Sequence, residues 1–565
     1  MGSHRRYVLA VALTLLTSIL STAEAVHLQG KILRVGYYGS SKGPFEQGID
    51  MYRPGYWAPI RVELDNRDGD QFTGYIEVRQ KDRDGDTVLA RRDVAVIGSR
   101  VYTLYIPAAI HHDTQSSFMI RVFTDTGRLA ELHDSGDNQI TELTSGTTNP
   151  IPTNARTVLD ISAQPVNQLN LMLKKTELQR PMFLCRCGPK ELPDDIAGLE
   201  MIDVIVWDAA DPSEIDLAQR TALIDWTGRG GMLILGVSKT WDRVKASRFA
   251  ELLPATLTGV ESLHSVVRER YGAMLDPSSS LENWLFGKLA PKTLEPALPV
   301  TSVAKASLVT GARPIVPDDP AANEPIFVSA RAYERGQVTL VSAELGDLFM
   351  PRYENQYTIE PAIFLRNLLE ATPKPGGSDD SNAQSAGMGG FGSYDLFRYL
   401  ESPIGFQTTT SFYLLIAFLF VTAYVAVATG GSWVWLKSKS MTKHAWTAFA
   451  ILATCGSAVS IGAVQFIRGI GLDVQELSIV DTVAGQTQAN ATSYFGLKSA
   501  THTTLDLRVP TDATSPNDIA PASPPLLKPL PKIGTIWSSE STTYSAGMKY
   551  EAIASSRRQR PWSTA

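Results

Sequence analysis

Residues Asp203 to Trp241 read DVIVWDAADPSEIDLAQRTALIDWTGRGGMLILGVSKTW, and this stretch decides the fold of the central part of the chain. It opens with an apolar, β-branched run, which is typical of a strand buried on both faces of a parallel sheet. A helix is predicted next, with Ser213 as its N-cap and Gly230-Gly231 as its end. The run GMLILG predicts a second buried strand. Together these elements indicate a strand-helix-strand crossover.

The flanking sequence extends this α/β region over residues 151–372. NARTVLDIS and PMFLCRCG predict two earlier strands, and PIFVSARAYERGQVTLVSAELGD predicts a β-hairpin around Arg335-Gly336. A helix with an apolar face is expected at 359–370. The insertion between these parts, which contains His264, is irregular.

Residues 26–150 have the period-two pattern of short strands separated by turns. The segments are KILRVGYY, APIRVELDN, TGYIEVRQ, TVLARRDVAV, VYTLYIP and SFMIRVFT. We expect an all-β sandwich of immunoglobulin-like type. Asp82, Asp84 and Asp86 are read as a hairpin turn and not as a calcium loop, because no bidentate Glu follows. His111-His112 is read as surface loop and not as a metal pair.

The N-terminus predicts export. Arg5-Arg6, an apolar run and Ala23-Glu24-Ala25 have the order of a secretory signal peptide over residues 1–25, with an uncleaved anchor as the alternative. Three cysteines cannot make a disulfide framework, so Cys185, Cys187 and Cys455 are interpreted as structural.

Two membrane spans are predicted after a polar, Gly-rich linker at 373–408. They lie at 409–430 and 445–467, and the loop at 431–444 carries Lys437, Lys439 and Lys443. The positive-inside rule makes this loop cytoplasmic, so both large flanks are expected on the extracytoplasmic side of the cytoplasmic membrane. Residues 468–565 are β-rich, and we expect this last segment to be incomplete.

The charge excludes one function class. The chain has 52 Lys and Arg against 58 Asp and Glu, and its basic residues form no stripe, which argues against nucleic-acid binding.

The stretch from Asp203 to Ser238 resembles the class I glutamine amidotransferase-like fold, a flavodoxin-like α/β layer. Bacterial envelope membrane proteins of uncharacterised function join such a layer to a signal peptide, a β-sandwich and paired spans. Active members of the fold carry a Cys on a strand-to-helix elbow and a His-x-Glu on a later strand. This chain has Ser238 at the position of the elbow, in GVSKT. It has Ala343-Glu344-Leu345-Gly346-Asp347 where the later motif is expected.

A serine hydroxyl without a base is a poor nucleophile, so we predict no catalytic residue and read Ser238 as a turn or N-cap residue. Asp208, Glu344 and Asp347 lie at predicted strand ends, where such sheets bind ligands. Together with Ser238 they are weak candidates for ligand binding. The alternative is that the carboxylates cap helices. No cofactor or metal is expected.

The predicted function is that of a non-catalytic membrane-anchored scaffold or subunit of a membrane complex, with membrane or envelope proteins as partners. Four small residues in the second span fit close helix packing against such a partner: Gly456, Ser457, Ser460 and Gly462. The alternative is that these residues face lipid. One alternative is a membrane-anchored hydrolase or amidase that uses Ser238 with Glu344 or Asp347. Another is a carbohydrate or peptide receptor that uses the aromatic residues Tyr52, Tyr56 and Trp57. The small-molecule ligand is left open.

Overall fold

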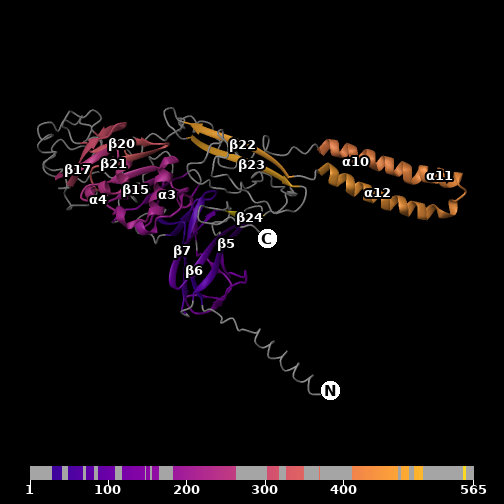
Figure 1. Ribbon diagram of the computed structural model, residues 1–565, viewed down its shortest axis with the longest axis horizontal. Coiled ribbons are helices and arrows are strands. Elements are labelled where there is room, and N and C mark those ends of the chain that lie inside the picture. Colours follow the sequence, from indigo (N-terminus) through magenta and orange to yellow (C-terminus); the bar gives the residue numbers. More distant parts are fainter. Residues whose placement is uncertain are drawn as a thin grey trace, which may run out of the picture. The chain divides into compact units, whose positions relative to one another are not determined.

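The computed structural model of the chain is shown in Figure 1. It describes residues 28–40, 49–67, 71–81, 87–108, 118–146, 148–152, 155–163, 182–262, 302–316, 326–348, 368, 410–468, 472–482, 489–499 and 551–554. The chain divides into two compact units, Met1–Gly392 with Val509–Trp562, and Ser393–Arg508 with Ser563–Ala565. Several predictions fall outside the described residues: the signal peptide, the Asp82 to Asp86 turn, His111-His112, His264, the helix at 359–370 except Leu368, and the linker at 373–408.

The N-terminal region forms two five-stranded sheets, ordered β10-β9-β1-β4-β7 and β11-β8-β5-β6-β24. The first contains β1 (Leu28–Val35), β4 (Trp57–Asn66), β7 (Gly98–Pro107), β9 (Leu132–His133) and β10 (Gln139–Ile140). The second contains β5 (Phe72–Lys81), β6 (Thr87–Val96), β8 (Met119–Thr124), β11 (Leu143–Thr144) and β24 (Glu551–Ala554).

Alternation in the sequence explains these strands. In β4, Ile60, Val62 and Leu64 are buried while the charged residues between them are partly exposed, as the period of two requires. The predicted strands of this region are all present. Strand β24 was not predicted, and it pairs in parallel with β6 although almost the whole chain separates them.

The central sheet has ten strands in the order β12-β3-β2-β14-β13-β15-β16-β21-β20-β19. Its parallel part comprises β13 (Arg156–Asp160), β14 (Met182–Arg186), β15 (Val204–Asp208), β16 (Met232–Gly236) and β21 (Gly336–Val341). Numbered along the chain, these five strands have the order 2-1-3-4-5, which is one of the two common orders of doubly wound α/β sheets. Both β15 and β16 are buried along their whole length, as their apolar sequences predict.

Strands from both flanks widen this sheet. On one side are β2 (Tyr37–Ser40), β3 (Ile49–Tyr52) and β12 (Thr148–Pro150), and on the other β20 (Val328–Tyr333) and β19 (Ala312–Val316). The predicted hairpin around Arg335-Gly336 is confirmed, because β20 pairs antiparallel with β21. A separate hairpin is formed by β17 (Ala255–Ser262) and β18 (Ser302–Leu308).

Helix α3 (Leu217–Gly228) connects β15 to β16 (Figure 1), and its predicted N-cap was wrong. Asp216, not Ser213, caps the helix in a reciprocal capping box with Gln219. Ser213 belongs instead to a short 3-10 turn, η3 (Pro212–Glu214), whose cap is Asp211. The end of the helix was predicted correctly, and Gly230 beyond it has φ +117°.

Gly336, at the start of β21, is required by a close backbone approach to the end of α3. A Cβ atom at this position would lie 1.9 Å from the carbonyl oxygen of Thr227 and 2.4 Å from that of Gly231. We expect Gly336→Ala to lower the free energy of unfolding by about 1–3 kcal/mol, because backbone atoms cannot move aside as a side chain does. Gly259→Ala is the matched control, since its Cβ would meet only Lys305 at 3.9 Å. Equal stability of the two variants in denaturant unfolding would contradict this expectation.

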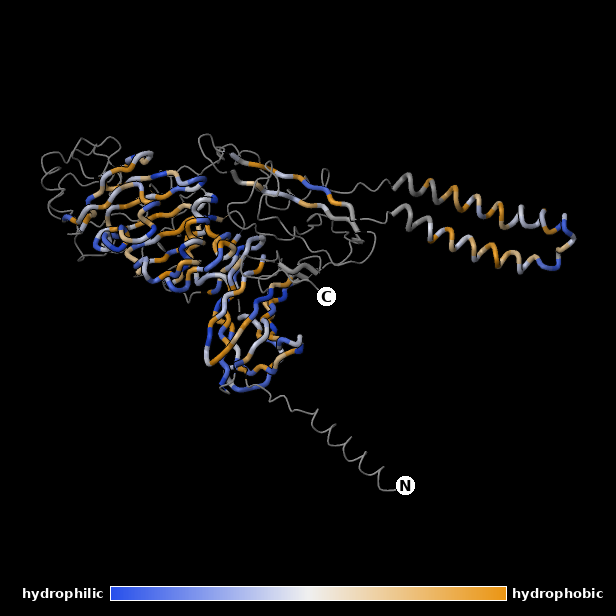
Figure 2. Tube along the Cα trace, viewed as in Figure 1, coloured by the Kyte–Doolittle hydropathy of each residue, from blue (hydrophilic) through white to orange (hydrophobic). Residues whose placement is uncertain are grey.

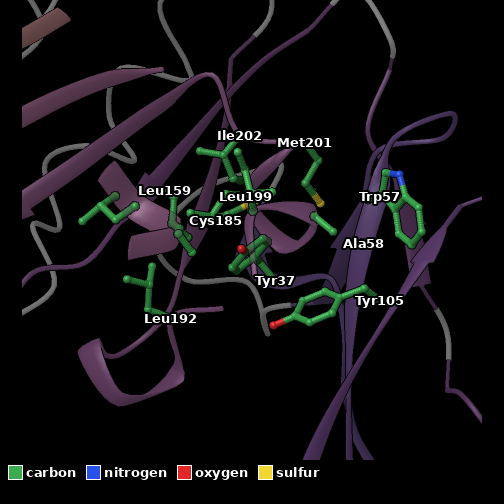
Figure 3. Packing of buried hydrophobic residues seen from close by; sticks show 14 of the residues in the cluster. Tyr37, Trp57, Ala58, Tyr105, Leu159, Cys185, Leu192, Leu199, Met201 and Ile202 are labelled. Carbon is green, nitrogen blue, oxygen red and sulfur yellow. The ribbon is translucent and has the colours of Figure 1, made fainter. Parts of the chain in front are cut away.

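The all-β region and the α/β layer share one hydrophobic core, part of which is shown in Figure 3. Polar contacts cross the same boundary. The hydroxyl of Tyr105, in β7, donates to Asp194 Oδ1 at 2.6 Å. The backbone N–H of Trp57 donates to Glu200 Oε2 at 2.7 Å. The two regions are therefore held together by both apolar and polar contacts.

The second unit contains two helices long and apolar enough to cross a membrane, Phe418–Ser438 and Ala445–Gly462. Figure 2 shows the hydropathy of their residues, hydrophobic along much of both helices and hydrophilic at the turn between them. The first is continuous from α10 (Thr410–Val425) through a π-helical segment, η8 (Ala426–Gly431), into α11 (Ser432–Ser438). It therefore runs through much of the predicted loop at 431–444. The second is α12 (Ala445–Arg468).

Gly456 lies where the two apolar helices of the second unit pack against each other. A Cβ atom there would lie 2.6 Å from the ring of Tyr424, so the glycine lets α12 approach the first helix closely. Beyond α12, β22 (Leu472–Thr482) and β23 (Ala489–Ser499) form an antiparallel hairpin, in agreement with the predicted strands.

Candidate functional site

The candidate site lies at the carboxyl edge of the parallel sheet, where β13, β15 and β16 end. Asp160 is the last residue of β13 and Asp208 the last of β15, and the two strands are neighbours. The chain order of the sheet reverses here, since β14 lies on the other side of β13. Such a switch point is where doubly wound sheets bind ligands. The sequence prediction placed its candidates at this edge.

Ser238 lies between β16 and the short helix α4 (Trp241–Ala246), in the strand-to-helix position that the sequence predicted. Its side chain has no exposed surface. Its hydroxyl donates a hydrogen bond to the backbone carbonyl of Ser302 at 2.6 Å. Ser302 is the first residue of β18, so Ser238 fastens this strand to the edge of the sheet.

Asp208 is buried and accepts two backbone hydrogen bonds. Leu345 N–H donates to Oδ1 at 2.7 Å and Gly346 N–H donates to Oδ2 at 2.8 Å. Both donors belong to the single-turn helix α7 (Leu345–Leu348), which follows β21. The carboxylate therefore caps that turn, as the alternative interpretation of the sequence predicted. Gly236 leaves room for it, because a Cβ atom there would lie 2.1 Å from Asp208 Oδ1.

Burial is the main influence on the acidity of Asp208 and raises the pKa of its carboxyl to about 7. The two backbone donors lower this pKa, and the nearby carboxylates of Glu344 and Asp160 raise it. A carboxyl group that titrates near neutral pH is one property of catalytic acids and bases. In this site the same group is enclosed by the sheet edge and α7.

Glu344 is also buried, and its contacts join the same segments. Its Oε1 accepts a hydrogen bond from the backbone N–H of Lys239 at 3.0 Å, and Lys239 Nζ lies 3.8 Å from its Oε2. The structure thus brings Asp208, Glu344 and the Ser238 turn to one edge. Asp347 lies in α7, but its side chain is outside the described part of the chain.

The sequence analysis missed Asp160. This carboxylate is buried, accepts a hydrogen bond from the Ser162 hydroxyl and lies 3.5 Å from Arg186 Nε. The sequence contains a pattern that could have indicated it: Asp160 ends the apolar run of NARTVLD in the same way that Asp208 ends that of VIVWD.

The chemistry available at this edge is limited by what its groups already bind. The serine hydroxyl donates to a main-chain carbonyl, and the carboxylates of Asp208 and Glu344 accept from main-chain N–H groups. Within the described residues no group of three or more His, Cys, Asp or Glu has the geometry of a metal site. Cys185 is buried, and burial raises the pKa of its thiol to about 12, which disfavours the reactive thiolate.

The aromatic candidates for sugar binding are mostly inside the protein. Tyr52 and Trp57 are buried, and the edge of Phe118 meets the Tyr52 ring at a centroid distance of 5.3 Å. Tyr56 is partly buried and stacks under the Arg53 guanidinium, whose carbon lies 4.3 Å from the ring centroid. Neither buried ring offers a face on which a sugar could stack.

Comparison with known proteins yields one family match, a domain of unknown function (DUF8726) over residues 43–135, which lies in the all-β region. No curated protein matches the chain. Among solved structures, a cytoplasmic protein from Salmonella typhimurium has 14% sequence identity and a TM-score of 0.26, with 38% of this chain and 99% of that chain covered. An exo-beta-1,4-mannosidase from Opitutaceae bacterium strain TAV5 has 13% identity and a TM-score of 0.20, with 34% of this chain and 31% of the enzyme covered.

Proposed function

We propose that this protein is a non-catalytic membrane-anchored scaffold, or a subunit of a membrane complex. In this proposal its all-β region is an immunoglobulin-like sandwich and its α/β layer is of the class I glutamine amidotransferase-like type. The observation that carries the proposal is the state of Ser238. At the position where active members hold their nucleophile, this chain has a fully buried hydroxyl that donates to the Ser302 carbonyl.

The polar groups of the edge support a structural role. Asp208, at the end of β15, accepts from main-chain N–H groups of α7, which follows β21, and Glu344 accepts from that of Lys239, in the turn after β16. Breaking the bond from Leu345 to bind a substrate would leave a buried N–H donor without an acceptor, which costs about 1–3 kcal/mol. The edge is built to hold its loops in place.

The anchoring part of the proposal rests on the two apolar helices and on β24. Because β24 pairs with β6, the chain segments before and after the helices meet in one sheet. If both helices span a membrane, these segments must lie on the same side of it. The lysines between the helices favour the cytoplasmic side for the turn, and therefore the extracytoplasmic side for the sheets.

Crosslinking of the full-length protein in native membranes, followed by affinity purification and mass spectrometry, tests the scaffold proposal. We expect membrane or envelope proteins to be recovered in stoichiometric amounts. A protein that runs as a monomer in detergent and crosslinks to nothing would overturn the proposal.

Replacing Ser238 separates the structural role from the catalytic one. We expect Ser238→Ala to lower the free energy of unfolding by about 1–2 kcal/mol, because the partly buried carbonyl of Ser302 loses the hydrogen bond from the Ser238 hydroxyl. Ser329→Ala is the matched control: Ser329 is equally buried, and its hydroxyl has no hydrogen-bond partner among the described residues, so its loss should be nearly neutral.

The same pair of variants tests for hydrolase chemistry. A serine-reactive fluorophosphonate probe should label wild type and Ser238→Ala equally weakly. Strong labelling of the wild type that disappears only in Ser238→Ala would favour the alternative, a membrane-anchored hydrolase.

A further inference from the structure

The turn between the two apolar helices is a compact, basic structure. Lys439 N–H donates to the carbonyl of Trp435 at 3.2 Å, and Met441 N–H donates to that of Leu436 at 2.9 Å. Ser440 takes the left-handed conformation with φ +56°, which reverses the chain. We call residues 433–446 the helical tip. Its backbone is closed by its own hydrogen bonds, and its described side chains are exposed apart from that of Leu436, which is buried.

The ionisable side chains of the helical tip are all basic. Lys437, Lys439, Lys443 and His444 are all exposed. No Asp or Glu occurs in the sequence between Glu401 and Asp473, so neither helix supplies a carboxylate to neutralise them. Any carboxylate or phosphate that pairs with these cations must therefore come from outside the helix pair.

Exposed tryptophans lie directly beside these cations. Trp433, Trp435 and Trp446 are 57%, 58% and 84% exposed, which is unusual for the largest apolar side chain. Lys437 Nζ lies 4.7 Å from the centroid of the Trp433 ring, so the ammonium group is held at the border of the aromatic surface. Tryptophan prefers the boundary between hydrocarbon and headgroups, where one end of the ring is apolar and the other is wet.

The length of α12 places these groups at a headgroup layer. The helix has 24 residues, which corresponds to about 36 Å and exceeds the hydrocarbon thickness of about 30 Å. Trp446 lies at one end of this helix and Arg468 at the other, so an α12 that spans a membrane would bring the lysines of the tip to the level of the lipid phosphates.

We propose that the helical tip is a binding surface for anionic phospholipid headgroups, in which the three lysines contact lipid phosphates and the three tryptophans lie in the acyl boundary below them. This inference rests on the proposed membrane anchoring and adds a lipid class to it. The occupant is lipid and not a protein acidic patch, because the charge adjoins an exposed aromatic belt that a soluble acidic partner would leave in water.

The test uses the full-length protein reconstituted into vesicles of phosphatidylcholine and phosphatidylglycerol, with spin-labelled analogues of each lipid to measure their relative association with the protein. We expect the wild type to prefer phosphatidylglycerol at least fivefold, the scale of a single basic residue near an anionic surface. The variant Lys437→Gln, Lys439→Gln, Lys443→Gln should lose this preference. Arg468→Gln, at the other end of α12, is the matched control and should keep most of it.

A second variant guards against a folding defect. Replacing the same three lysines by arginine keeps the charge, and we expect it to keep the preference. Equal association of both lipids with the wild type, or a preference that survives the triple glutamine variant, would overturn the assignment to the tip. A protein that carbonate washes from the vesicles would overturn the membrane anchoring itself.

Discussion

Trp57→Ala should destabilise the all-β region and the α/β layer together. Trp57 has no exposed surface, and truncating a buried tryptophan costs about 3–5 kcal/mol. It belongs to the core that both regions share, and its backbone N–H is bonded to Glu200. The loss of stability should therefore appear in both the all-β region and the α/β layer. We would measure hydrogen exchange of the full-length protein in detergent at the level of individual peptides. Protection should be weaker in β4 and β7 and also in β15 and β16.

Two further variants control this result. Trp57→Phe should cost much less, because it keeps most of the packing and removes an indole N–H that has no hydrogen-bond partner among the described residues. Trp446→Ala makes the same change at a site that is 84% exposed and should leave exchange in the first unit unchanged. Loss of protection confined to β4 and β7 would show that the two regions unfold independently. The proposal could then no longer treat them as one rigid scaffold.

The parts of the fold that depend on local patterns were predictable from the sequence. Alternation gives the strands of the all-β region, and unbroken apolar runs give β15 and β16. The N-cap of α3 was missed because Ser213 and Asp216 both precede the helix, and only the reciprocal bond between Asp216 and Gln219 distinguishes the true cap from Ser213. The first apolar helix runs past residue 430, where the predicted span ends, because the chain passes Gly430-Gly431 as a π-helical segment and continues into α11.

Long-range pairing could not be predicted. Nothing near β24 indicates that it pairs with β6, and nothing near β2 indicates that it extends the central sheet beside β14. The same applies to the candidate site. Asp208 and Ser238 were selected from their strand ends, but what they do is decided by α7 and Ser302, which lie far along the chain. The sequence shows at which strand end a side chain lies, but the tertiary structure decides which groups that side chain contacts.

The stability of the first unit should fall as the pH rises from about 4 to 7 through the titration of Asp208. The pKa of this carboxyl is about 7 in the folded protein, against 3.8 for an ordinary aspartate. Between these values the folded state holds a proton that the unfolded state has released, so the contribution is fully present below pH 3.8 and is lost through pH 7. The slope has an upper limit of about 1.4 kcal/mol per pH unit. Thermal unfolding followed by tryptophan fluorescence across this range measures it.

Asp208→Asn isolates this titration from that of other groups. It should flatten the pH dependence of the unfolding temperature. It also lowers the stability at every pH, because an amide nitrogen cannot accept the hydrogen bond that one of the two N–H donors, Leu345 or Gly346, makes to the carboxylate. Glu344→Gln should move the titration to lower pH, since the charge of Glu344 raises the pKa of Asp208. An infrared carboxyl band that persists above pH 5 in the wild type and is absent from Asp208→Asn would identify the group directly. Equal slopes for wild type and Asp208→Asn would mean that the two backbone donors keep Asp208 ionised at neutral pH, and that its burial costs less than we expect.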